Sequence, residues 1–333
     1  MAADLAPAAG PGCVAWRRGL WTVFLLFTTG LIVHLAGSLD WAGAFAALRA
    51  LPLGTLLAAL ACAAAGHAIY ASYEMLGRPL RPTRWRGRAG QAGTAATRAV
   101  PARWMLAVGF VSFAFKLNLG TVVGGVALRY RLYGRLGLAF DETTRILAAS
   151  VLTNWIGYVA LAGALLLAQP PLLPAGWGPG PGALRAVGAG LLLSAVAYAV
   201  ACGRAEGREW HWRRHALRLP SLRVALLQFG LSALHWLLTA AVCWVLLQRQ
   251  VDFASVLNAL LVSAVAGLIT HVPGGVGVIE AVFIGLLQSR VGQAELLAAL
   301  LGFRAVYYLL PLMLAVALFF VVDRRRAGMN AGA

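Results

Sequence analysis

Three ionisable side chains inside strongly apolar segments are the residues of this chain best suited to chemistry. Lys116, the only lysine, lies in one such segment, and Glu280 and Arg304 lie in two others. Inside a membrane, each unpaired charge would cost about 2.5–3.5 kcal/mol on insertion scales. A carboxylate at that depth can bind a headgroup amine or carry a proton, whereas lysine and arginine suit phosphate.

Each of these side chains also has a structural alternative. Glu280 can stabilise the start of a short helix or pair with Arg304. Arg304 can serve as that partner or reach back to the outer headgroups. Lys116 and Asn118 either contact a headgroup or phosphate, or Lys116 reaches the interface while Asn118 caps a half-helix. The residues alone leave these alternatives open.

A glycine-rich break follows Pro273, whose ring removes a backbone donor. The glycines that tolerate unusual backbone angles here are Gly274, Gly275 and Gly277. We expect a helix to stop near His271 and a short one to begin near Val276. Broken helices at membrane depth present free amides and a partial positive charge to anions, so these glycines are candidate substrate-binding residues.

Arg129 and Arg131 follow the segment that holds Lys116. They either capture the phosphate of an inner-leaflet lipid or only fix the topology. The sequence contains no His-Glu-x-x-His or Gly-x-Ser-x-Gly motif and no close pair of carboxylates inside its apolar segments, and its four cysteines are scattered. We therefore assign no catalytic residue, no metal site and no cofactor, and we expect a protein that is not an enzyme.

Composition identifies the setting in which these residues work. The chain has 333 residues, of which 61% are hydrophobic and only 12% are charged, against about 25% charged in soluble domains. It is therefore an all-α polytopic membrane protein. Its net charge of +17 reflects arginine-rich loops held on the cytoplasmic side and not nucleic-acid binding.

Hydropathy divides the chain into eight apolar segments in one membrane domain, residues 17–325. The six expected full spans are 21–39, 51–73, 146–168, 184–202, 224–247 and 296–322. Segments 104–128 and 256–287 are expected to be re-entrant hairpins. Residues 1–16 are expected to be disordered and 326–333 to form a tail, with both termini cytoplasmic in a bacterial inner membrane.

Charge and length support the two re-entrant hairpins. If segment 104–128 crossed the membrane, the loop that follows it would lie outside despite carrying four arginines. Segment 256–287 is too long for one span and short for two. The hairpins enter from opposite sides, so residues 17–168 and 184–325 are predicted to form an inverted repeat with a site where the broken elements meet.

Two groups of motifs, in this order and separation, resemble the transmembrane region of lysylphosphatidylglycerol synthases, the flippase half of the multiple peptide resistance factor. They are Asn118-Leu119-Gly120-Thr121, Gly124-Gly125, Arg129-Tyr130-Arg131-Leu132-Tyr133 and His271-Val272-Pro273-Gly274-Gly275-Val276-Gly277-Val278-Ile279-Glu280. The resemblance covers about residues 17–325. It implies a domain that moves an aminoacylated or other phospholipid between leaflets. Only seven residues follow Arg326, so we do not expect the soluble synthase activity of the full-length members.

Three functions are compatible with these features. The favoured one is a lipid transporter of the flippase type, whose partners are membrane lipids and above all anionic phospholipid. The alternatives are an intramembrane lipid transferase and a non-catalytic subunit that supports a separate synthase or transferase. The sequence leaves homo-oligomerisation open. It has no nucleotide-binding loop, so a gradient or simple equilibration would drive transport.

Overall fold

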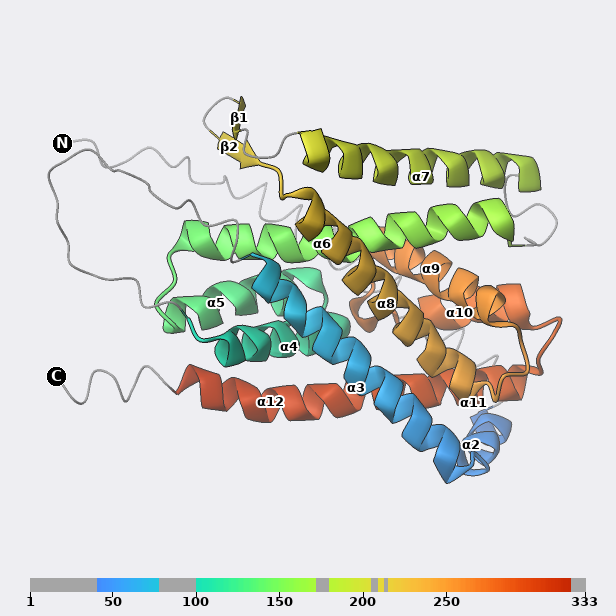
Figure 1. Ribbon diagram of the computed structural model, residues 1–333. Coiled ribbons are helices and arrows are strands. Elements are labelled where there is room, and N and C mark those ends of the chain that lie inside the picture. Colours follow the sequence, from blue (N-terminus) through green and yellow to red (C-terminus); the bar gives the residue numbers. More distant parts are fainter. Residues whose placement is uncertain (1–40, 78–99, 172–179, 205–208, 213–214, 325–333) are drawn as a thin grey trace, which may run out of the picture.

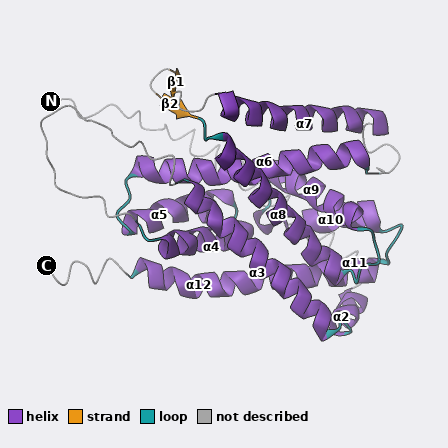
Figure 2. Ribbon diagram, viewed as in Figure 1, coloured by secondary structure: helices purple, strands orange, loops and turns teal. Residues whose placement is uncertain are grey.

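The computed structural model describes residues 41–77, 100–171, 180–204, 209–212 and 215–324, which are almost entirely helical (Figures 1 and 2). The expected first span and the two terminal segments lie outside these residues. In the described part of the chain, six helices are long and apolar enough to cross a membrane. The all-α polytopic class is therefore confirmed.

Five of the six expected full spans fall within the described residues, and all five are helices. They are α3 (Leu53–Leu76), α6 (Phe140–Ala168), α7 (Pro181–Arg204), α8 (Leu222–Leu246) and a continuous rod made of α11 (Gln293–Phe303), the π-helical turn η3 (Arg304–Leu309) and α12 (Leu310–Asp323). Helix α6 begins six residues before its predicted start. Its first turn carries Asp141 and Glu142, which suit a helix N-terminus but hide it from hydropathy.

The first predicted hairpin is present. Helix α4 (Ala102–Leu119) ends at Gly120, whose φ of 84° is in the left-handed region. The chain then returns through the π-helical turn η1 (Thr121–Ala127) and α5 (Leu128–Arg135). At Gly124 the returning element η1 lies so close to α4 that a Cβ would overlap the backbone of Phe115. The break at Gly120 falls inside the segment, 104–128, that the sequence predicts to be a hairpin.

The second hairpin also breaks where the sequence predicts. Helix α9 (Phe253–Thr270) ends at His271, and a 3₁₀ turn, η2 (Pro273–Gly275), leads to α10 (Val278–Leu287). His271 has a φ of 53°, and its Nδ1 donates to the carbonyl of Ile269 at 2.9 Å. Helix α9 meets the length and hydropathy criteria for a full span. Nevertheless, the chain turns back after it.

Four elements differ from the sequence-based expectations. Helix α2 (Trp41–Arg49) and the antiparallel strands β1 (Glu209–Trp212) and β2 (His215–Arg218) occupy segments expected to be loops. Arg129 and Arg131 were also expected in a loop but lie on α5. Hydropathy misses α2 and α5 because both are only eight or nine residues long, and α5 is polar.

The two hairpins enter the helical bundle from opposite ends, and their tips meet inside it (Figure 1). Gly274 of η2 lies beside the carbonyl oxygens of Leu117 and Asn118 at the end of α4. Asn118 also donates its side-chain amide to the carbonyl of Tyr308 on η3 at 3.2 Å. The fold therefore brings both glycine-rich breaks to one place.

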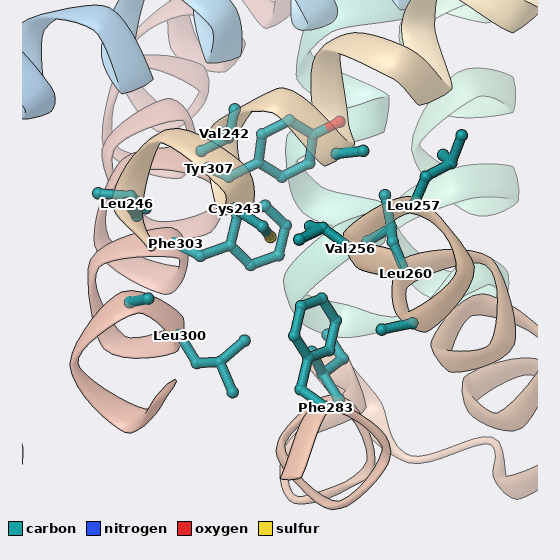
Figure 3. Close-up of a cluster of buried hydrophobic side chains, with 14 of the residues drawn as sticks. Val242, Cys243, Leu246, Val256, Leu257, Leu260, Phe283, Leu300, Phe303 and Tyr307 are labelled. Atoms are coloured by element: carbon teal, nitrogen blue, oxygen red, sulfur yellow. The ribbon is translucent and has the colours of Figure 1, made fainter. Parts of the chain in front are cut away.

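A buried apolar cluster holds the second hairpin against the rest of the bundle (Figure 3). It contains side chains from α8, α9, α10, α11 and η3. Its labelled members are Val242, Cys243, Leu246, Val256, Leu257, Leu260, Phe283, Leu300, Phe303 and Tyr307. In a membrane, tight packing and not water exclusion stabilises such contacts, so this cluster fixes where the η2 tip lies.

Candidate functional site

A cavity of about 280 Å³ lies where the two hairpin tips meet. Its lining residues come from both hairpins, from α6 and α8, and from the α11–α12 rod. Its polar lining residues are Lys116, Thr121, Asn154, His235, Thr239, Ser263, Tyr307 and Tyr308, and the glycines Gly274 and Gly275 also line it. The cavity therefore combines groups from segments more than 150 residues apart in the sequence.

Lys116 is the cationic side chain in the cavity lining. It is half-buried, and its ammonium lies 3.4 Å from the Tyr70 hydroxyl. The same nitrogen is 5.4 Å from the centre of the Tyr70 ring and 6.0 Å from that of Phe113. Among the described residues it forms no ion pair with a carboxylate. Aromatic faces therefore hold this charge without neutralising it.

Several other polar groups of the lining already have protein partners. Nδ1 of His235 donates to the carbonyl of Gly66 at 3.1 Å. The hydroxyls of Thr239 and Tyr307 are 2.8 Å apart and share a hydrogen bond. These contacts fix the walls of the cavity, because a buried polar group that has a partner does not need to reorient.

Glu280 and Arg304 do not line the cavity but lie directly behind its glycine wall. Nε and Nη2 of Arg304 contact the Glu280 carboxylate at 2.6 and 3.0 Å. The guanidinium also donates to the carbonyls of Gly274 and Gly275 at 3.0 and 3.1 Å. Glu280 in turn accepts the amide of Gly277 at 2.9 Å. The pair therefore holds the shape of the second hairpin tip.

The first hairpin has a matching pair, formed by the candidate residue Arg129 and by Glu74, which was not among the candidate site residues. Glu74 at the end of α3 is fully buried, and its Oε1 lies 2.8 Å from Nη2 of Arg129 on α5. Arg129 also donates to the carbonyl of Gly125 at 2.7 Å. Tyr133 and Ser150 complete the shell by donating to the carboxylate at 2.7 and 2.9 Å.

From the sequence, Glu74 is expected to pair with a loop arginine, but not in a buried position at the base of a hairpin. The available signal was an isolated acid at the end of an apolar segment. Arg131, by contrast, is exposed and contacts Asp323 at 3.1 Å at the end of α12. Asn118 donates to the carbonyls of Ala114 and Tyr308, so it joins α4 to η3. A substrate-binding role for Arg129, Arg131 and Asn118 remains a prediction.

Comparison with known proteins adds to this picture. The family described as "Lysylphosphatidylglycerol synthase TM region" matches residues 20–315. The chain belongs to this family. It is 35% identical to the Escherichia coli inner membrane protein YbhN over 93% of both chains. It is 30% identical to the Synechocystis protein slr0712 over 66% of this chain and 70% of that protein.

A partial match reaches phosphatidylglycerol lysyltransferases. A phosphatidylglycerol lysyltransferase of Staphylococcus haemolyticus is 32% identical over 91 residues, which are 26% of this chain but only 11% of that enzyme. The family match accordingly places this protein among membrane proteins that have the transmembrane region. It shows no catalytic domain in the matched part.

Proposed function

We propose that this protein moves a phospholipid between the leaflets of a bacterial inner membrane, with the headgroup passing through the cavity between the hairpin tips. The observation that carries the proposal is the meeting of two broken elements from opposite ends at one polar cavity. Secondary transporters commonly bind substrate at such a junction near the membrane midplane. Membership of a family named for a lipid synthase makes a phospholipid the expected cargo.

The rim of the cavity favours a lipid over a water-soluble substrate. Val151 of α6 and Leu268 of α9 belong to the lining and are 44% and 51% exposed. In the membrane these apolar side chains face lipid tails. A headgroup could therefore enter between α6 and α9 while its acyl chains stay in the bilayer.

The two hairpin tips are the elements proposed to control access. Each hairpin is interrupted by a glycine-rich break and is held by a guanidinium–carboxylate pair. Rocking of one hairpin against the other would expose the cavity to one leaflet at a time. Both chain termini are proposed to be cytoplasmic, as the positive-inside rule favours.

A bulky residue in the cavity tests the proposal. Gly267 lines the cavity, and a Cβ there meets no atom within 4 Å, so Gly267→Phe should fill the space without disturbing α9. Gly190 on the exposed face of α7 has the same freedom but lies outside the cavity, so Gly190→Phe is its matched control. Purified variants are reconstituted in liposomes with fluorescent phospholipids, and dithionite reports the leaflet distribution.

Wild type and Gly190→Phe should redistribute a labelled phospholipid, and Gly267→Phe should be slower by about tenfold or more. Equal rates for the two variants would show that lipid does not pass through this cavity. If wild type moves no lipid of the native membrane, the transport proposal fails. The supporting-subunit and transferase alternatives then become the leading ones.

A further inference from the structure

We infer that the cavity selects phospholipids whose headgroup carries a net negative charge, with Lys116 as the counter-ion of the headgroup phosphate. The inference rests on the proposed function and narrows it to a substrate class. The inference excludes cationic aminoacyl lipids, which the family name suggests, as the preferred substrates. The juxtaposition that carries it is a half-buried ammonium in a cavity whose described lining contains no carboxylate and no second ammonium.

The charges around the cavity can be counted from the described residues. Glu280 lies behind the glycine wall, but both of its oxygens are engaged by Arg304 and the Gly277 amide. Glu74, on the helix that carries Tyr70, is paired with Arg129. These pairs cancel internally. Lys116 therefore leaves the described lining with one net positive charge.

Aromatic packing fixes where that charge lies. Tyr70 is buried, and its ring stacks on Phe113 with centroids 3.7 Å apart. Both rings lie beside the Lys116 ammonium, whose hydrogen-bond partner is the Tyr70 hydroxyl. An ammonium has three donors, and this one neutral acceptor leaves two of them for a ligand. A phosphate oxygen would supply both the acceptor and the missing negative charge.

The same charge count argues against cationic headgroups. A lysyl ester adds two ammonium groups, which need carboxylate or carbonyl acceptors when they leave water. The described lining offers hydroxyls, one asparagine, one histidine and Lys116 itself, which repels them. Zwitterionic choline heads face a weaker form of the same repulsion. The positive charge of Lys116 would thus give selectivity by repelling cationic and zwitterionic headgroups.

Lipid binding to the purified full chain tests this directly. Native mass spectrometry in neutral detergent compares phosphatidylglycerol, phosphatidylcholine and lysylphosphatidylglycerol on wild type. We expect phosphatidylglycerol to bind at least about tenfold more tightly than the other two, or about 1.4 kcal/mol. Soluble glycerol 3-phosphate is added as a competitor to separate a lipid site from a site for free phosphate.

Four variants make the test specific. Lys116→Met removes the charge at similar length and should abolish the preference, whereas Lys116→Arg should keep it. Thr121→Asp adds a carboxylate to the exposed cavity tip and should reduce the preference even if Lys116→Met folds poorly. Arg145→Met removes one positive charge from an exposed position on α6 outside the cavity and should change nothing.

Each outcome separates this inference from transport itself. If Lys116→Met and Thr121→Asp keep the wild-type preference, or wild type has none, the inference is overturned even though lipid flipping in liposomes could stand. If the preference depends on Lys116 but no lipid flips, the inference holds and the transport proposal fails. Equal binding of glycerol 3-phosphate and phosphatidylglycerol would overturn the assignment to a lipid.

Discussion

At the scale of single residues, two arginines perform the same task at opposite hairpins. Arg129 binds the carbonyl of Gly125 and the carboxylate of Glu74. Arg304 binds the carbonyls of Gly274 and Gly275 and the carboxylate of Glu280. Glycine-rich breaks leave carbonyls without helical partners, and lipid tails cannot satisfy them. A guanidinium has enough donors to bind such carbonyls and a carboxylate together.

Removal of one member of the buried pair should therefore be costly. Glu74→Gln leaves Arg129 with an uncompensated charge, which typically destabilises a protein by about 3–5 kcal/mol. The double variant Glu74→Gln/Arg129→Met removes both charges, so it should lose less stability than Glu74→Gln alone. Unfolding by SDS titration from mixed micelles would measure the free-energy differences.

The exposed pair of Arg131 and Asp323 supplies the control. Because water screens it, Asp323→Asn should change the unfolding midpoint very little. If Glu74→Gln is as mild as Asp323→Asn, the buried pair does not hold the first hairpin. If the double variant is worse than Glu74→Gln, the burial of a lone charge is not the cause of the loss.

At the scale of elements, the sequence predicts both hairpin breaks and that they meet, but not which residues make the contacts. Glycine and proline act locally, so the stops near Gly120 and His271 are legible in the chain itself. The pairing of Glu74 with Arg129 spans 55 residues, and the contact of Asn118 with Tyr308 spans 190. No local pattern encodes such pairs. The cavity and the burial of Glu74 therefore had to come from the structure.

Gly124 is the position at which the first hairpin depends most on glycine. A Cβ there would overlap the backbone of Phe115 and Lys116, which cannot move away as a flexible side chain can. We expect Gly124→Ala to separate α4 from η1 and to cost at least about 1–3 kcal/mol, as overpacking does. Thermal unfolding followed by tryptophan fluorescence would show the loss as a lower Tm.

Gly134 on α5 of the same hairpin is the matched control, because a Cβ there meets no atom within 4 Å. Gly134→Ala should be neutral or stabilise the protein by about 0.4–1 kcal/mol. Equal effects of the two alanines would contradict the close approach of η1 to α4. Since Lys116 lies at that contact, Gly124→Ala should also weaken the preference for anionic lipid.

At the scale of the whole molecule, the arrangement depends on hairpins that enter from opposite sides. In Figure 1, α4 and α5 lie toward one end of the bundle. Helices α9 and α10 lie toward the other end. Helices α3 and α8, the second spans of the two predicted repeats, pack against each other. The inverted repeat of 17–168 and 184–325 stays a prediction, and locating the membrane would test it.

Cysteine accessibility in intact cells and inverted vesicles would locate the membrane. In a cysteine-free background, Ala102→Cys and Ala139→Cys mark the two ends of the first hairpin, and Gln250→Cys and Ser289→Cys mark those of the second. All four positions are exposed in the described structure. An impermeant maleimide should label the first two only from the cytoplasmic side, because positive charge gathers there. It should label the last two only from outside. Opposite labelling within either pair would make that segment a full crossing, and the two tips would no longer form a site open to alternate leaflets.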